Sequence, residues 1–248
     1  MMVRHVSAEC LDGLAVDDST AMHSRRDLQR IHRLMRTQSM LVTVLGDRMR
    51  SNESTPTRIL ELGAGDGSLM LHVAEVMGFQ GRPVEITLLD RQPLINDKTI
   101  NAFRAAGWTA VAQTRDVLDW VCDAGTALPG DSERTRWDVI VANLFLHHFE
   151  NPELVALLNA VAQRCNHFVA YEPRRSGFAL AASRLLGVIG ANAVTREDAV
   201  LSVHAGFNDH EITAFWPAPA DEWHLQEGPA GPFSHCFVAD RAMGDHEN

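Results

Sequence analysis

The stretch ILELGAGDGS, residues 59–68, decides how this 248-residue chain folds. An apolar run at 58–62 predicts a buried strand, three glycines follow it, and a helical pattern begins at Ser68. Glycine is needed where the backbone turns sharply and where a ligand approaches it, because no Cβ stands in the way. The order of strand, glycine turn and helix therefore predicts a site for a nucleotide-like ligand.

Acidic residues in and around this turn narrow the choice of ligand. A dinucleotide site carries GxGxxG and holds a pyrophosphate at the helix N-terminus. This loop is GxGxG, and the carboxylates of Glu61 and Asp66 would repel a pyrophosphate but suit a cationic amino-acid group. The next predicted strand ends at Asp90, which can accept hydrogen bonds from ribose hydroxyls. A dehydrogenase is thus the weaker alternative.

Short apolar runs alternate with helical patterns through the middle of the chain. The predicted strands are residues 58–62, 84–89, 108–113, 137–142 and 167–171, with helices at 68–77, 93–106 and 151–164. Such alternation favours right-handed βαβ units and a parallel sheet. Two further runs, 223–226 and 234–239, flank a turn rich in glycine and proline and predict a terminal antiparallel hairpin.

The remaining segments predict a cap around this sheet. Residues 1–20 are polar and predict a loose arm, and the spacing of apolar residues in 21–50 predicts one or two amphipathic helices. We divide the chain into an arm and helical cap, 1–52, and a core domain, 53–248. Within the core domain, 174–215 forms a predicted substrate-cap segment. In it we expect a helix at 177–189, irregular chain at 195–207 and a short helix at 209–215.

Composition excludes several classes of protein. With 22 basic and 32 acidic residues the net charge is −10, which argues against a protein that binds phosphate backbones. No apolar run reaches the roughly 20 residues that span a bilayer, and the N-terminus lacks a signal pattern. The four cysteines are far apart, so we expect neither a disulfide framework nor a cysteine zinc site. A cytoplasmic protein without nucleic-acid or membrane partners is expected.

Five segments, in order, resemble the class I S-adenosylmethionine-dependent methyltransferases. They are ELGAGDGS (61–68), LLD (88–90), RDV (115–117), WDVIVANLFLHHF (137–149) and VAYEP (169–173). The resemblance implies a Rossmann-like, doubly wound α/β fold with a mostly parallel seven-stranded sheet, a terminal antiparallel hairpin at one edge and an N-terminal helical cap. The LFLHHF segment is similar to small-molecule enzymes of the ubiquinone and menaquinone methyltransferase group.

The resemblance also implies a cofactor site, with S-adenosylmethionine as methyl donor and S-adenosylhomocysteine as product. It places Asp90 on the ribose and Arg91 beside the adenine. The remaining implied contacts are Glu61, Gly63, Ala64 and Gly65 along the methionine part, Asp116 and Val117 at the adenine, and Asn143 and Leu144 beside the sulfonium and the substrate entrance.

Two histidines are the candidate catalytic groups, because they follow the fourth predicted strand at the ligand-binding edge of the sheet. Adjacent residues of a helix point in different directions, so at most one of them should face the substrate. Related enzymes keep a histidine at the position of His148, which implies an anchoring role there. His147 is then the candidate base or substrate contact. The alternative is that both histidines serve only as packing or helix-capping residues.

Candidate substrate contacts lie in the cap. Arg174 follows the fifth strand and can bind a carboxylate or oxyanion, and His204 can reach the pocket from the cap segment. His23 and Arg26 lie on the N-terminal helix. A solvent-exposed role is the alternative for each. No metal is expected, since neither HxxxH nor HExxH occurs and helical geometry would keep His147 and His148 from chelating one ion.

The sequence thus predicts a methyltransferase that acts on a small molecule in secondary or cofactor metabolism. An oxygen nucleophile is favoured, with nitrogen or carbon as alternatives, and the enzyme is expected to be a monomer or homodimer. An enzyme acting on RNA or protein is the first alternative. The acidic balance and the lack of an NPPY-type tetrad after the fourth strand count against it. A non-catalytic protein that binds S-adenosylmethionine is the second.

Overall fold

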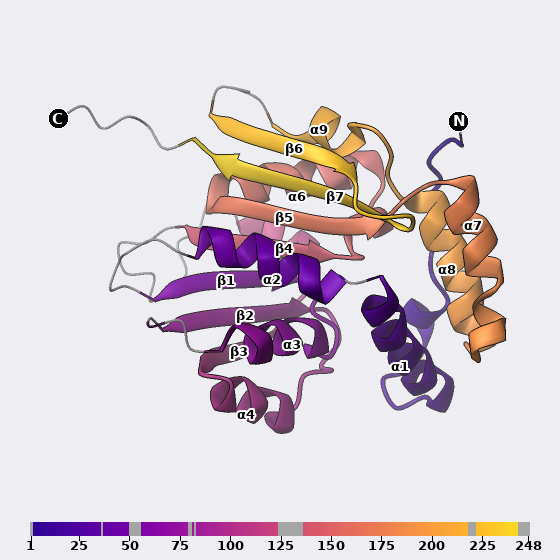
Figure 1. Cartoon of the computed structure of the whole chain (residues 1–248), viewed down its shortest axis with the longest axis horizontal. Helices are drawn as coiled ribbons and strands as arrows, with labels where there is room; N and C mark the ends of the chain where they lie inside the picture. Colours follow the sequence, from indigo (N-terminus) through magenta and orange to yellow (C-terminus); the bar gives the residue numbers. More distant parts are fainter. Residues whose placement is uncertain are drawn as a thin grey trace.

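The computed structural model describes residues 2–35, 37–49, 56–78, 81, 83–123, 136–217 and 222–242. Its centre is a seven-stranded sheet with the order β3-β2-β1-β4-β5-β7-β6 (Figure 1). The strands are β1 (Thr57–Leu62), β2 (Val84–Asp90), β3 (Trp108–Thr114), β4 (Trp137–Asn143), β5 (Cys165–Pro173), β6 (Trp223–Pro229) and β7 (Ser234–Arg241). Strands β1 to β5 are parallel, and the hairpin of β6 and β7 adds to β5 in antiparallel fashion, which confirms the predicted fold.

Helices cover both faces of the sheet. They are α1 (Ser19–Leu34), α2 (Thr37–Arg48), α3 (Ser68–Met77), α4 (Asp97–Ala105), α5 (Val117–Cys122), α6 (Asn151–Arg164), α7 (Gly177–Arg184), α8 (Ala193–Ala205) and α9 (Glu211–Phe215). Side chains of β1 alternate between two cores, as a strand buried on both faces requires. Ile59 packs with α2, α3 and α4, whereas Leu60 and Leu62 pack with α5, α6 and α9.

Local signals explain where several helices begin. Gly67 has a positive φ of 75° and precedes α3 directly. The helix α6 starts at the predicted residue, because Glu150 and Glu153 form a reciprocal capping box around its first turn. None of the described helices is long and apolar enough to cross a membrane. The predicted linker at 51–56 lies outside the described residues, apart from Pro56.

The prediction of irregular chain at 195–207 was wrong, because this segment is mostly the helix α8. The Asn192 side chain caps it by accepting a hydrogen bond from the Thr195 N–H at 2.8 Å. Two of its buried residues, Thr195 and Asp198, are polar, so no clean apolar stripe marks the helix in the sequence. The short helix α5 was not predicted either, because we recognised only the motif RDV (115–117) at its start.

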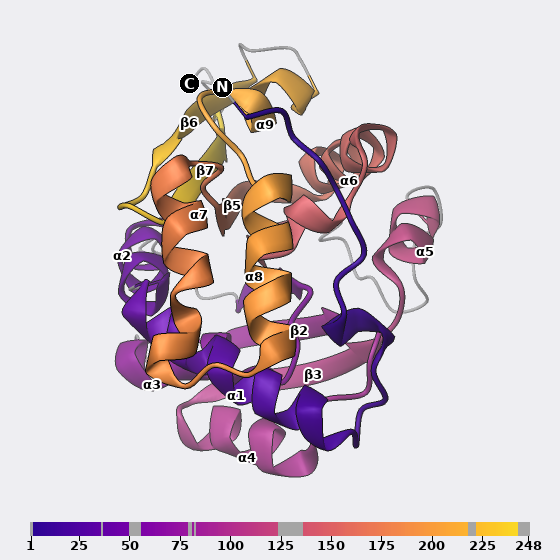
Figure 2. The ribbon, with the colours of Figure 1, turned by 90° about the vertical axis from the view of Figure 1, so that its right-hand side faces the viewer.

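The N-terminal arm is not loose, contrary to the prediction. The Arg4 guanidinium donates hydrogen bonds to the carbonyls of Ala205 and Phe149, both at 2.9 Å. Further along, the N–H groups of Cys10 and Leu11 donate to the Asp198 carboxylate at 2.7 and 2.9 Å. The arm therefore runs along α8 (Figure 2). Its partners are far away in the sequence, so no local pattern could reveal them.

Three helices gather at the end of the sheet where the parallel strands finish (Figure 1). There α7 and α8 lie side by side, and α1 packs against α8 (Figure 2). The third helix of the predicted cap segment, α9, packs instead against α6 and β6. The division at residues 52 and 53 stays a prediction.

An ion-pair cluster fastens α2 to the hairpin edge of the sheet. Arg48 donates two hydrogen bonds to the Asp240 carboxylate, at 2.7 and 2.6 Å, and His167 Nδ1 lies 2.8 Å from the same carboxylate. Burial raises the pKa of Asp240, but the hydrogen bonds from His167 and Arg48 outweigh it and lower this pKa to about 2. The ionised carboxylate therefore stabilises the folded state.

We expect Asp240→Asn to lower the free energy of unfolding by about 1–3 kcal/mol at pH 7, since hydrogen bonds to a charged group are lost. The folded pKa lies below the ordinary value of 3.8. This stabilisation is therefore complete above pH 4 and is lost as the pH falls toward 2. Urea unfolding at several pH values measures both effects. The exposed Asp17 provides the control Asp17→Asn, and equal stability of the two variants at pH 7 would contradict the assignment.

Candidate active site

A cleft of about 530 Å³ opens at the carboxyl ends of β1, β2 and β4. Every residue that the resemblance assigned to the cofactor lines it: Glu61, Gly63, Ala64, Gly65, Asp90, Arg91, Asp116, Val117, Asn143 and Leu144. Both candidate catalytic histidines line it as well, together with Glu9 from the arm and Ser202 from α8. The fold thus brings together segments from the whole length of the chain.

The glycine loop has no room for a side chain at its tightest point, Gly63. Gly63 has a φ of 68°, and a Cβ on it would lie 2.2 Å from the ring of Phe145. Gly65 has a φ of 56°, and its N–H donates to the Asp90 carboxylate at 2.8 Å. The same carboxylate accepts the Gln92 N–H at 2.8 Å. Asp90 therefore holds the glycine loop against the end of β2.

Glu61 is a buried carboxyl group without a cationic partner among the described residues. Only 2% of the residue is exposed, and its Oε2 atom makes no hydrogen bond with any described residue. Burial raises its pKa well above the ordinary value, and the nearby charges of Asp66 and Asp90 raise it further. A cation in this part of the cleft would therefore be favoured.

The end of β4 is shaped by Glu172, a fully buried carboxylate on β5. It accepts the backbone N–H groups of Phe145, Leu146 and His147 at 3.0, 2.8 and 3.3 Å. Just before them, Leu144 adopts a positive φ of 49°, a costly conformation for a residue with a side chain. The carboxylate therefore holds a strained turn that ends in a short 3-10 helix, Leu146–His148.

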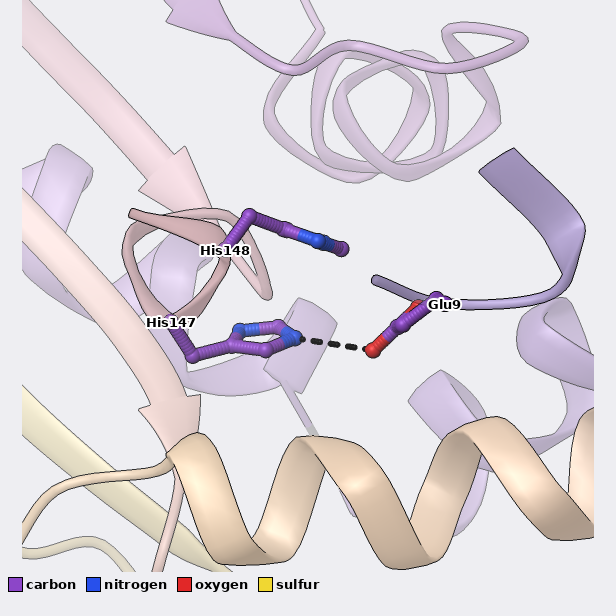
Figure 3. A group of neighbouring side chains, drawn as sticks. All are labelled: Glu9, His147 and His148. Atoms are coloured by element: carbon purple, nitrogen blue, oxygen red, sulfur yellow. Dashed lines mark hydrogen bonds and ion pairs between the residues drawn. The ribbon is translucent and has the colours of Figure 1, made fainter. Parts of the chain in front are cut away.

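The two histidines lie differently from the prediction. His147 is the anchored one: it is buried, its Nδ1 lies 2.8 Å from Glu172, and its Nε2 lies 3.3 Å from Glu9 (Figure 3). His148 is only partly buried, and both rings point toward Glu9 with their centroids 4.3 Å apart (Figure 3). A 3-10 turn rotates adjacent residues by about 120°, slightly more than an α-helix does, so the side-chain torsions bring the two rings together.

The His147 imidazole and the Glu9 carboxylate stabilise each other's charged forms. Burial lowers the pKa of His147, but its hydrogen bonds to Glu172 and Glu9 raise it to about 9. Burial raises the pKa of Glu9, yet the hydrogen bond and positive charge of His147 bring it down to about 2. Ser202 also donates a hydrogen bond to Glu9. Sequence reasoning missed Glu9, because a lone glutamate in a polar arm carries no signal.

The four predicted substrate contacts are not among the described residues that line the cleft. Two of them, His23 and Arg26, are exposed on α1. Arg174 forms an isolated β-bridge with Phe207, and the carbonyl of His204 accepts the N–H of His5 at 3.1 Å.

The helix α1 does reach the cleft, but through other residues. Gln29 donates to Asp66 at 2.7 Å, and Arg25 donates to the Gln92 side chain at 3.1 Å. The prediction thus identified the right helix but the wrong face of it. Only the packing of α1 on α8 and α3 determines which face points inward.

Comparison with known proteins agrees with this geometry. A family model described as a methyltransferase domain matches residues 23–227. The chain belongs to this family and is a class I S-adenosylmethionine-dependent methyltransferase. Among curated proteins, no sequence matches the chain significantly.

Solved methyltransferases share the fold at low sequence identity. The plantazolicin methyltransferase BpumL, in complex with SAH, is 13% identical, with 92% of each chain covered and a TM-score of 0.64. The plantazolicin methyltransferase BamL, in complex with a triazolic desmethylPZN analog and SAH, is 13% identical, with a TM-score of 0.59. That match covers 91% of this chain and 92% of BamL.

We expect Gly63→Ala to weaken the binding of S-adenosylhomocysteine at least tenfold. The new Cβ would displace the Phe145 ring, and the positive φ adds strain of about 1–2 kcal/mol. Isothermal titration calorimetry measures the affinity. Gly46→Ala is the matched control, because a Cβ in that helix meets nothing within 4 Å and should stabilise the fold slightly. Unchanged affinity in the first variant would refute the role of the loop.

Proposed function

We propose that this methyltransferase transfers the methyl group of S-adenosylmethionine to a small molecule, with an oxygen nucleophile favoured. The observation that carries the proposal is the wall of the cleft beyond the glycine loop. Glu9 of the arm, Gln29 of α1 and Ser202 of α8 all line it. The volume of the whole cleft, about 530 Å³, falls within the roughly 300–1,000 Å³ that is typical of small-molecule sites. An RNA or protein surface would need a more open edge.

In this proposal Glu61 and the glycine loop hold the methionine end of the donor. The ammonium group of the donor would supply the cationic partner that the buried Glu61 lacks. Asp90 accepts from the ribose, and Arg91, Asp116 and Val117 surround the adenine. The sulfonium then lies beside Asn143 and Leu144. This arrangement is supported by the convergence of all these residues on one cleft.

Methyl transfer from a sulfonium is an in-line displacement in which positive charge disperses. A pocket with little water does not penalise that transition state, and alignment of the reactants provides most of the rate. The histidine turn follows β4 directly and Glu9 of the arm contacts it, so we place both at the acceptor end of the cleft. The positive charge of His147 at that end favours an acceptor whose oxygen can ionise, such as a phenol, carboxylic acid or enol. We propose that His147 and His148 act on this acceptor.

We propose that other residues than those suggested by the sequence form the substrate side of the cleft. We assign it to Arg25 and Gln29 of α1, together with Phe149 after the histidine turn. The cleft offers no support for His23, Arg26, Arg174 or His204. We further propose that the enzyme works in the cytoplasm as a monomer or homodimer. The four free cysteines, one of them fully buried, fit a reducing compartment.

Protein stripped of bound cofactor should be stabilised by S-adenosylhomocysteine and not by NADH. A ligand at 100 times its dissociation constant adds about 2.7 kcal/mol to the free energy of unfolding. Thermal unfolding with each ligand measures the shift. A rise in Tm with NADH alone would point to a dehydrogenase.

The variant Glu61→Gln separates binding from folding. It keeps the shape of the side chain but removes the carboxylate that should pair with the donor's ammonium group. We expect affinity for S-adenosylhomocysteine to fall at least tenfold, while the Tm of the ligand-free protein does not fall. The variant removes the cost of burying a charged group and the repulsion from Asp66 and Asp90, so the ligand-free fold loses no stability. Calorimetry and thermal unfolding test both, and unchanged affinity would exclude Glu61 from the donor site.

A further inference from the structure

Three side chains that can bind a metal ion converge at the acceptor end of the cleft. Glu9 comes from the arm, and His147 and His148 come from the turn after β4 (Figure 3). Each offers one ligand atom, and these atoms all lie within 4.8 Å of one another. All three residues line the cleft. The proposed binding of the donor uses none of these side chains.

The spacing of the best-placed pair suits two ligands of one ion. His147 Nε2 and Glu9 Oε1 are 3.3 Å apart. Ligand bonds of 2.0–2.2 Å at tetrahedral or octahedral angles would separate neighbouring ligand atoms by about 3.0–3.5 Å. The same distance is within hydrogen-bond reach, so the ion would replace the proton that His147 shares with Glu9. His148 supplies the third ligand atom, which lies within 4.8 Å of the other two.

The neighbours of these ligands hold them in the orientation that a metal needs. Glu172 lies at the Nδ1 atom of His147, so an ion that replaces the proton on Nε2 would find the lone pair of this atom beside Glu9. Glu172 is itself fixed by three backbone N–H groups. Ser202 donates to Glu9 from the other side. A carboxylate behind a ligating histidine is the usual outer-shell arrangement of metal sites.

We propose that Glu9, His147 and His148 bind one divalent transition-metal ion, such as Zn²⁺ or Fe²⁺. Two imidazoles and one carboxylate are a ligand set that these ions prefer. Three protein ligands leave coordination positions open toward the cleft, which is typical of catalytic rather than structural sites. The expectation of no metal rested on helical geometry and on the absence of HxxxH and HExxH, and it did not consider a ligand from the distant arm.

The chemical role of the ion rests on the proposed function. An ion at the acceptor end would bind the oxygen of a phenol, enol or carboxylic acid and lower its pKa, so that the proton leaves to water before the methyl group arrives. It would also orient that oxygen toward the sulfonium. The substrate class is then an acceptor with an ionisable oxygen. Binding of the metal itself does not depend on this role.

Titration of the chelator-treated, full-length protein with Co²⁺ tests the site. We expect one Co²⁺ per chain, with visible absorption bands from nitrogen and oxygen ligands, a dissociation constant in the micromolar range or lower, and displacement by Zn²⁺. Glu9→Ala and His148→Ala should each weaken Co²⁺ binding more than about tenfold, because each loses a direct ligand. His72→Ala is the matched control. This histidine forms an exposed pair with Glu75 on α3, away from the cleft, and its removal should change nothing.

Thermal unfolding of each variant establishes that it is folded, and Glu9→Gln supplies a second variant that keeps the size of the side chain. No saturable Co²⁺ binding by the wild type would overturn the proposal, and so would full binding by folded His148→Ala and Glu9→Gln. S-adenosylhomocysteine binding to the metal-free protein is measured in parallel and should be the same in wild type and His72→Ala. Its absence from the wild type would refute the proposed function, while the Co²⁺ result would still decide the metal site.

Discussion

The buried carboxylate of Glu172 is the interaction on which the site depends. It accepts three successive backbone N–H groups at the end of β4 and thereby holds the turn that follows Leu144. That turn places the Phe145 ring against Gly63, so the same carboxylate indirectly fixes the glycine loop. It also orients His147. The glycine loop and the histidine turn, on two sides of the cleft, are therefore set by one buried group that is not among its lining residues.

The parts of the fold that could be predicted are those encoded over short distances. The strand, glycine turn and helix of residues 58–77 repeat a pattern that local backbone geometry enforces, and the resemblance carried by this and four other segments named the residues that line the cleft. The helix α6 carries its own start signal in Glu150 and Glu153. By contrast, α8 buries polar residues against the arm, so its hydrophobic pattern is weak.

The parts that could not be predicted depend on contacts between distant segments. Glu9 reaches His147 across 138 residues of sequence, and Asp198 accepts the Cys10 N–H across 188. No spacing rule covers such distances. The face of α1 that points inward was missed for the same reason. The orientation of His147 was missed because it depends on Glu172, which lies on another strand.

The docked arm gives the enzyme a built-in order of assembly. Residues 2–18 leave the ribosome first, yet their partners on α8 and beyond β5 are made much later. The carbonyl of Phe149 accepts from Arg4, and Ser202 holds Glu9, so the arm cannot dock fully until α8 has been made. The end of the cleft that carries Glu9 is therefore completed after the glycine loop.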